Sequence, residues 1–420
     1  MENANNQAGA GGPTSPAPPP GTPISDIRPP ISELRSSTPK RILLVVPVYA
    51  SYHSFLRELG DALVDTGWEV CVACNLSVTM GQDYDRAHMK RIRFCDFKFP
   101  RGANPVAHML GARQLRKIIR EIQPTLIHAH FSAAILTTAL AVRRNDPAIA
   151  IGTFQGLQFP LLSGFKRRLY RMAEVFSSKR LDGVWVLTRD DLEALQAAGV
   201  EQAHIQETFG FGCRIDHFDP ERFSEADRAQ LREKHNIPAD AKVFIYVGRN
   251  VAFKGFHLVV NAFLRLLKSE PNIRLLIVGD LDPLHPSGLT PEGEAAMIQT
   301  PEIIRCGWQK DVAPYLAIAD VMVHPSAREG MPVGCMEALA MGLPLVAPDA
   351  RGTREMLDLF NLKSLEGLKE HHLISSMRKF IEQACSHDER AFTSLKRPFL
   401  NRANYLLEQI EIYKQAIESE

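Results

Sequence analysis

The chain has 420 residues, of which 45% are hydrophobic and 23% are charged, and its formal net charge is +1 at pH 7. These values are typical of a globular protein of about two to three domains, and they exclude a collagen-like, a largely disordered or a multi-span membrane chain. The near-neutral charge gives no indication of a nucleic-acid partner. Seven scattered cysteines indicate free thiols rather than a disulfide framework, and no secretory signal pattern opens the chain. We therefore expect a cytoplasmic protein.

Residues 1–39 are rich in proline, glycine and serine and poor in apolar side chains. Such a segment cannot bury enough surface to offset the entropy of ordering. The sequence predicts a disordered tail over 1–39, and a proline motif for a partner domain is the alternative interpretation.

From residue 41 onward, short apolar runs alternate with amphipathic runs. RILLVVPV is continuous, apolar and β-branched, as a buried strand should be. The first series predicts strands over 41–48, 68–74, 91–97, 125–131, 148–154 and 183–188, and helices over 51–67, 105–121, 132–143 and 165–179. A second series predicts strands over 243–249, 273–280, 303–308, 321–326 and 343–349, and helices over 255–268, 311–319, 333–341 and 401–417.

Alternating strands and helices predict parallel sheets covered on both faces. A polar stretch over 216–240 separates the two series. We predict an α/β protein with two doubly wound, Rossmann-like domains that face each other across a cleft. The expected domains cover 40–216 and 217–397, and a closing helix covers 398–420.

Several common motifs are missing or incomplete. No strand is followed by G-x-G-x-x-G, and no phosphate-binding P-loop pattern occurs. Cys71 and Cys74 lie three apart on a predicted strand, so they should point to opposite faces and hold neither a metal nor a disulfide. His128 and His130 share a face, but no third ligand is evident, which favours packing or a hydrogen bond to substrate. We expect no metal and no cofactor.

Two bases follow the first strand of the second series. Arg249 stands at the strand end, and Lys254 precedes the next helix after Gly248 and a short loop. Both cations can converge on one anion, aided by the free amides of that helix end. A diphosphate leaving group fits two such cations.

Two glutamates follow a later strand. Glu329 lies in a loop before a helix that begins around Pro332, and Glu337 lies about one turn into that helix. Carboxylates accept hydrogen bonds from vicinal hydroxyls, so sugar hydroxyls are suitable partners. Gly330 and Gly334 permit a ligand to approach the backbone closely.

These segments carry a family resemblance. VGRNVAFKG, GWQKDVAPYLAIADVMVHPS and REGMPVGCMEALAMGLPLVA resemble the ordered motifs of glycosyltransferase family four, and GCRIDHF resembles the family's interdomain linker. The match runs from about residue 205 to residue 357. It implies the GT-B fold, in which two Rossmann-like domains face each other.

The resemblance implies a role for each donor-side residue. Arg249 and Lys254 would bind the donor diphosphate and Glu329 the hydroxyls of the donor sugar, so that these three carry the catalysis. Glu337 would hold the ribose, and the backbone of Gly248, Gly330 and Met331 would lie against the donor. Transfer would retain the anomeric configuration and need no metal, with the leaving phosphate taking the acceptor proton.

The N-terminal half resembles the acceptor half of enzymes that extend lipid-linked surface polysaccharides. LIHAHFSAAILTTAL and IGTFQGLQFPLLSG carry this likeness, although Gln155 stands where the family often has histidine. VPVYASYH replaces the common Gly-Gly loop after the first strand. The acceptor-side candidates are His53, His130, Gln155 and Gly156.

The resemblance therefore predicts a glycosyltransferase that moves a hexose or N-acetylhexosamine from a nucleotide diphosphate sugar, most simply a UDP-sugar, to a glycan or glycolipid. Two alternatives remain open: a GT-B-shaped nucleotide-sugar epimerase, and an inactive scaffold that binds sugar nucleotides. Bases interleaved with apolar residues in GFKRRLYRMAEVFSSKR, residues 164–180, indicate either a solvated helix face or contact with an anionic membrane.

Overall fold

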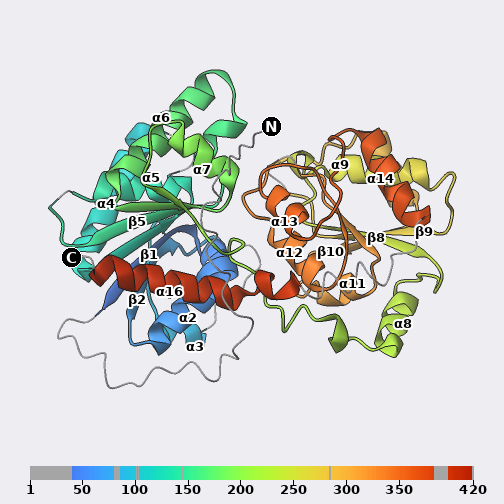
Figure 1. The fold of residues 1–420 in the computed structure, drawn as a ribbon, viewed down its shortest axis with the longest axis horizontal. Coiled ribbons are helices and arrows are strands. Elements are labelled where there is room, and N and C mark those ends of the chain that lie inside the picture. The colour runs from blue at the N-terminus through green and yellow to red at the C-terminus, as the bar shows by residue number, and fades with distance from the viewer. Residues whose placement is uncertain are drawn as a thin grey trace, which may run out of the picture. The chain divides into compact units, whose positions relative to one another are not determined.

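The computed structural model describes residues 40–79, 86–100, 102, 104–143, 145–282, 285–326, 328–382 and 396–418. The expected tail over 1–39 lies outside the described residues. The chain from Thr38 to Glu420 forms one compact unit that contains two parallel sheets (Figure 1).

The first sheet has seven strands in the order β3-β2-β1-β4-β5-β6-β7. Its strands are β1 (Arg41–Val48), β2 (Glu69–Asn75), β3 (Arg93–Asp96), β4 (Leu126–His130), β5 (Ile149–Phe154), β6 (Gly183–Val186) and β7 (Ala203–Ile205). Its helices are α1 (Tyr49–Ser51), α2 (Arg57–Asp65), α3 (Arg86–Arg91), α4 (Pro105–Ile122), α5 (Ser132–Ala141), α6 (Gly164–Arg180) and α7 (Arg189–Gln196), with short turns η2 (Tyr52–Leu56) and η3 (Phe159–Leu161).

The second sheet has five strands in the order β10-β9-β8-β11-β12. Its strands are β8 (Lys242–Val247), β9 (Ile273–Val278), β10 (Ile303–Gly307), β11 (Val321–Val323) and β12 (Leu345–Val346). The remaining helices are α8 (Glu225–Lys234), α9 (Phe256–Leu266), α10 (Pro291–Gln299), α11 (Ala313–Ala317), α12 (Val333–Ala340), α13 (Arg354–Leu359), α14 (Glu370–Glu382) and α16 (Arg402–Glu418), with turns η4 (Pro220–Arg222), η5 (Ala252–Lys254) and η6 (Arg397–Leu400).

The predicted α/β fold with two doubly wound sheets is confirmed, and each expected element is present. Most strands are shorter than expected, and prolines limit the last two. β11 stops before Pro325 and β12 lies between Pro344 and Pro348, because a proline has no amide hydrogen to extend a ladder. The polar stretch over 216–240 contains a helix that was not expected, α8, which Ser224 and Asp227 start with a reciprocal capping box.

Burial follows the alternation of strand side chains. Cys71 packs in the cluster on one face of the first sheet and Cys74 in the cluster on the other face, as their spacing predicted. Neither forms a disulfide.

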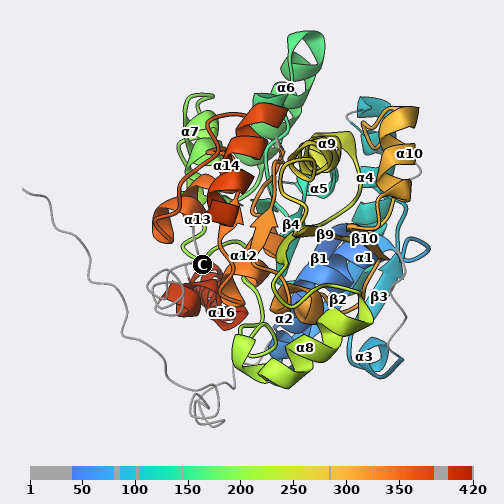
Figure 2. The ribbon, with the colours of Figure 1, turned by 90° about the vertical axis from the view of Figure 1, so that its right-hand side faces the viewer.

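The C-terminal helix α16 returns to the first sheet. It lies beside α2 in both views (Figures 1 and 2). Tyr405 and Tyr413 of α16 are buried in the same cluster as Leu44 and Val72 of the sheet. Within the described residues, none of the helices combines the length and apolar character that a bilayer crossing needs.

Candidate active site

Both sheets change winding direction beside their first strand. β1 lies between β2 and β4, and β8 lies between β9 and β11. Ligands of open α/β sheets bind outside the carboxyl ends of the strands at such a point. His53 follows β1 and His130 ends β4, while Arg249 and Lys254 follow β8 and Glu329 follows β11. The candidate residues therefore lie at the two switch points.

Lys254 and Glu329 form the closest ion pair of the donor side. The Lys254 Nζ donates to both Glu329 carboxylate oxygens, at 2.5 and 2.8 Å. Gly255 makes this approach possible, because a Cβ at that position would lie 2.4 Å from the Pro325 carbonyl oxygen. Its φ of 73° also falls in the left-handed region that favours glycine.

A second cation stabilises the Glu329 carboxylate. The Nε2 of buried His324 lies 3.2 Å from Glu329 Oε1. Burial would raise the pKa of Glu329, but His324 and Lys254 outweigh it and lower the pKa to about 2. Burial would lower the pKa of His324, yet neighbouring Cys335 and Glu329 raise it to about 10. Glu329 is therefore ionised between two cations.

Arg249 is paired with a different carboxylate. Its Nη1 donates to Asp282 Oδ2 at 2.6 Å, and its guanidinium lies 5.4 Å from the ring centre of Phe253. The side chain is 45% exposed, so a ligand can reach it. Among the described residues Arg249 and Lys254 share no partner, and their convergence on one anion stays a prediction.

Glu337 has the opposite electrostatic environment to Glu329. Burial raises the pKa of Glu337 to about 7, although Arg402 and Arg214 oppose the shift. No described residue forms a hydrogen bond or an ion pair with its carboxylate. Glu337 lies in α12, for which Pro332 is the N-cap residue, close to the expected helix start. A half-buried carboxylate of this kind can accept hydrogen bonds from a ligand.

The backbone around Gly330 meets the first-sheet half directly. A Cβ on Gly330 would lie 2.1 Å from the Gln155 carbonyl oxygen, and a Cβ on Gly156 would lie 3.2 Å from the Gly330 Cα. Met331 packs against Gly210 in the same way. The structure thus brings Gln155 and Gly156 together with Gly330, and Gly210 together with Met331, which no spacing in the sequence indicated. Gly248 stands apart from this contact, at the end of β8.

His130 and Gln155 form one buried pair. The Gln155 Nε2 donates to His130 Nδ1 at 2.9 Å, which leaves His130 Nε2 and Gln155 Oε1 buried without a partner among the described residues. Burial lowers the pKa of His130 to about 3, so its imidazole is neutral at ordinary pH. The His128 ring lies beside that of His130, with ring centres 3.9 Å apart and planes tilted by 38°, as expected of two histidines on one strand face. His128 also bonds Tyr413 and Thr153.

His53 lies on a π-helical turn after β1. Its Nε2 is 3.3 Å from Arg57 Nη1, and its ring packs 6.0 Å from that of Tyr49. The acceptor-side role of His53 stays a prediction.

A pocket of about 250 Å³ opens at the carboxyl ends of β4 and β5. Its walls include Phe131, Ser132, Gln155, Tyr170 and Glu174. They combine aromatic surface with hydroxyl, amide and carboxylate groups, which is the mixture that a sugar ring requires.

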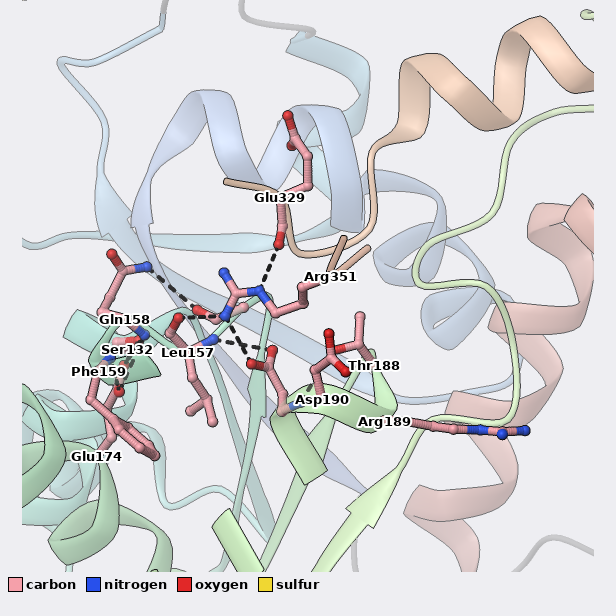
Figure 3. Close-up of polar contacts among 12 residues, drawn as sticks. Ser132, Leu157, Gln158, Phe159, Glu174, Thr188, Arg189, Asp190, Glu329 and Arg351 are labelled. Carbon is pink, nitrogen blue, oxygen red and sulfur yellow. Dashed lines mark hydrogen bonds and ion pairs between the residues drawn. The ribbon is translucent and has the colours of Figure 1, made fainter. Parts of the chain in front are cut away.

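The sequence did not single out four polar residues of this region: Glu174, Asp191, His324 and Arg351. Figure 3 shows the network that Glu174 and Arg351 form around the loop after β5. Glu174 accepts from Ser132 Oγ at 2.7 Å and from the amides of Gln158 and Phe159. One signal was available for Glu174, because it is the only acid in the basic helix α6. Arg351 bonds the Glu329 backbone 22 positions away and two residues 160 or more positions away, so no short motif indicates these contacts.

Among the described residues, no group of three or more histidines, cysteines or acids could hold a metal ion. The expectation that the protein needs no metal and no cofactor stays a prediction.

Two parallel sheets, each with candidate residues at its switch point, are the arrangement of a GT-B protein. Comparison with known proteins supports the same fold and family. The model for "Glycosyl transferases group 1" matches residues 241–364, and the model for "Glycosyl transferase 4-like domain" matches residues 52–206. The chain belongs to the family-four-like glycosyltransferases of the GT-B fold.

Two curated relatives are named as glycosyltransferases. EpsD of Bacillus subtilis, named as a glycosyltransferase, is 26% identical over 76% of this chain and 81% of its own length. An Escherichia coli enzyme named UDP-Gal:alpha-D-GlcNAc-diphosphoundecaprenol alpha-1,3-galactosyltransferase is 23% identical over 60% of this chain and 65% of its own length.

Two solved structures show the same fold. A glycosyltransferase from Rickettsia africae has a TM-score of 0.73 at 18% identity, covering 91% of this chain and all of its own. Anabaena HepE, in complex with UDP and glucose, has a TM-score of 0.69 at 16% identity, covering 88% of this chain and 98% of its own.

Proposed function

We propose that this glycosyltransferase moves a hexose or N-acetylhexosamine from a UDP-sugar to a lipid-linked glycan during cell-surface polysaccharide assembly. The observation that carries the proposal is Glu329, which is buried and ionised between Lys254 and His324 at the switch point of the second sheet. A carboxylate held in this state can orient sugar hydroxyls, and the adjacent lysine can neutralise a departing phosphate.

The proposed transfer retains the anomeric configuration and needs no metal. The bond between the anomeric carbon and the diphosphate oxygen breaks while a bond to the acceptor oxygen forms on the same face. The acceptor proton passes to the leaving phosphate, which gives UDP and the new glycoside. Lys254 and Arg249 stabilise the diphosphate charge, and Glu337 accepts hydrogen bonds from the ribose.

The relatives support the choice of donor and acceptor. The name of the Escherichia coli relative states a UDP-sugar donor and a diphosphoundecaprenol-linked acceptor. The HepE structure was solved in complex with UDP and glucose. The pocket lined by Tyr170 and Glu174 would hold the acceptor sugar.

The surface beside this pocket supports a membrane-borne acceptor. α4 and α6 both pack against α5, and α6 also forms a wall of the pocket. Large exposed apolar side chains on these two helices are Val106, Met109, Leu110, Phe165, Met172 and Phe176. Exposed bases of α6 stand between them, namely Lys166, Arg167, Arg168 and Arg171. Such a mixture fits an anionic bilayer, so we place the enzyme peripherally on the inner face of the plasma membrane.

A donor screen tests the central proposal. The protein is titrated by calorimetry with UDP-, GDP- and ADP-sugars, and Arg249→Ala is titrated beside it. We expect selective binding of one UDP-sugar and a loss of affinity of about tenfold in the variant, since one charged contact disappears. Binding of none of these nucleotide sugars would overturn the proposal.

An inactive scaffold is the second candidate, favoured by Gln155 and by the neutral state of its partner His130. Both functions predict binding of a nucleotide sugar. Turnover separates them: release of UDP in the presence of a polyprenyl-diphosphate-linked sugar supports the transferase, and tight binding without release supports the scaffold. Conversion of a UDP-sugar to its epimer without any acceptor would instead indicate an epimerase.

Vesicle flotation tests the membrane contact. We expect the protein to float with phosphatidylglycerol vesicles and Phe165→Glu to lose most of this binding, because Phe165 is 79% exposed beside the basic residues. Leu407→Glu on α16 is the matched control, since Leu407 is also exposed but lies on another helix. Equal loss in both variants would contradict a specific α6 surface.

A further inference from the structure

Arg351 joins segments that are far apart in the sequence. Its Nε donates to the Glu329 carbonyl oxygen at 2.9 Å. Its Nη1 donates to the Leu157 carbonyl oxygen at 2.6 Å and to Asp191 Oδ1 at 2.8 Å. The side chain is 10% exposed and that of Asp191 is fully buried. One guanidinium therefore ties the loop after β11 to the loop after β5 and to α7 (Figure 3).

Two buried carboxylates hold the other side of the β5 loop. Asp191 Oδ2 accepts from the Leu157 amide at 3.2 Å, and Glu174 accepts from the amides of Gln158 and Phe159 at 3.0 and 3.1 Å. Three successive amides of this loop thus donate their hydrogen bonds to side-chain carboxylates and not to the backbone of a strand or helix. The backbone of residues 157–159 is consequently held by these carboxylates and by Arg351.

The two loops touch through their backbones. Gly330 lies against the Gln155 carbonyl, and Gly352, which follows Arg351, lies against the Gly330 carbonyl. A Cβ on Gly352 would come within 2.3 Å of that oxygen. With no side chain between them to absorb a shift, a displacement of one loop displaces the other.

The contact reaches the residue that carries the proposed chemistry. Arg351 bonds the backbone of Glu329, whose carboxylate points away from Arg351 in Figure 3 and pairs with Lys254 and His324. The three acceptors are reached from two separate nitrogens of the planar guanidinium, Nε and Nη1, whereas a lysine presents all its donors from a single nitrogen. If Arg351 served only as a stabilising ion pair, its bond to Asp191 would be sufficient and the two bonds to backbone carbonyls would not be needed.

We propose that Arg351 is a positioning residue that locks the Glu329 loop to the acceptor-side loop 155–159 and so aims Glu329 at the donor sugar. The role in catalysis rests on the proposed function, whereas the coupling of the two loops does not.

Hydrogen exchange measured by mass spectrometry tests the coupling without any substrate. We expect Arg351→Met to speed exchange by about tenfold in two separate places, residues 157–159 and residues 328–331, because both lose a shared anchor. Arg354→Met is the matched control. Arg354 also pairs with α7, through Asp190, but its side chain is 42% exposed and its partners Asp190 and Asp349 lie in neither loop.

Ligand binding tests the positioning of Glu329. Calorimetry with UDP and with UDP-glucose compares a probe without the sugar to one that carries it. We expect Arg351→Met to leave the UDP affinity within about threefold and to weaken UDP-glucose by about tenfold more, because only the sugar depends on Glu329. General destabilisation would weaken both ligands alike. If UDP-glucose is not the donor, the UDP-sugar selected by the donor screen replaces it.

A conservative variant keeps the test valid if Arg351→Met fails to fold. Arg351→Lys retains a charge beside Asp191 but cannot reach all three acceptors, so the same two exchange changes are expected. Faster exchange in only one loop, or equal changes in Arg354→Met, overturns the coupling. Parallel weakening of UDP and the UDP-sugar overturns the positioning role. Failure to bind any nucleotide sugar overturns the proposed function and leaves the exchange result intact.

Discussion

Glu329 on the donor side and His130 on the acceptor side are both buried, but they have opposite charge states. On the donor side, burial of Glu329 is compensated by Lys254 and His324, and its pKa falls to about 2. On the acceptor side, no charge among the described residues compensates the burial of His130, and its pKa falls to about 3. The first group is charged at pH 7 and the second is neutral.

This difference assigns different chemistry to the two sides. A fixed anion beside a lysine suits recognition of hydroxyls and control of a departing diphosphate. A neutral imidazole with a pKa of about 3 is a poor base at pH 7, but it can orient Gln155 through a hydrogen bond. If the leaving phosphate takes the acceptor proton, as proposed, His130 needs only to position groups and not to act as a base.

The largest expected effect follows from removing Lys254, the cation that pairs with Glu329. Lys254→Ala should lower turnover at least about a hundredfold, on the scale of one charge contact that stabilises a transition state. Steady-state rates of UDP release measure it, and circular dichroism confirms the fold. Activity within about threefold of the parent would show that Lys254 does not serve the diphosphate.

Gly330→Ala tests the backbone contact between the two sides. The new Cβ would lie 2.1 Å from the Gln155 carbonyl oxygen, so we expect a loss of about 1–3 kcal/mol in unfolding free energy, as for other overpacked sites. Gly334→Ala is the control, since its Cβ would meet only Met322 at an ordinary 3.6 Å. Chemical denaturation compares the variants, and equal stabilities would mean that the loops do not press together.

The donor side was largely predictable from the sequence because its residues lie in short, ordered segments. The strand before Arg249, the loop carrying Lys254 and the spacing from Glu329 to Glu337 are all local patterns. The ion pair between Lys254 and Glu329 was not predicted, because it depends on Gly255 approaching Pro325, seventy positions on.

The acceptor side resisted prediction because its contacts are long-range. The pair of His130 and Gln155 requires β4 to lie beside β5, and the anchor at Arg351 requires the last strand of the second sheet to end near α7. Burial decides the charge of His130, and the identity of the residue alone does not reveal it.

The dependence of the unfolding free energy on acid pH tests the charge state assigned to His130. His130 has a folded-state pKa below its unfolded value, so its contribution to stability is present above pH 6.5 and is lost as pH falls toward 3. We expect the unfolding free energy to fall by about 2 kcal/mol from this residue between pH 7 and pH 5. His130→Asn should remove that part of the fall, as measured by urea denaturation at both pH values. The exposed His204→Asn serves as the control, and an equal fall in the parent and in His130→Asn would refute the assignment.

The smallest expected effect separates the two glutamates of the donor side. Burial raises the pKa of Glu337 to about 7, so its ionisation destabilises the free protein increasingly as pH rises from 4.5 to 7. Glu337→Gln should therefore raise the unfolding free energy at pH 8 by about 1 kcal/mol, reduced from the full shift because the side chain is partly exposed.

Glu329→Gln should act in the opposite direction, since a carboxylate with a lowered pKa stabilises the fold above pH 4.5. Donor titrations complete the test. If Glu337 holds the ribose, the variant that stabilises the free protein must weaken UDP binding, and UDP affinity in the parent must rise as Glu337 ionises near pH 7. If Glu337→Gln gains stability and its UDP affinity is unchanged, Glu337 does not contact the donor. The buried carboxylate would then destabilise the free protein without contributing to UDP binding.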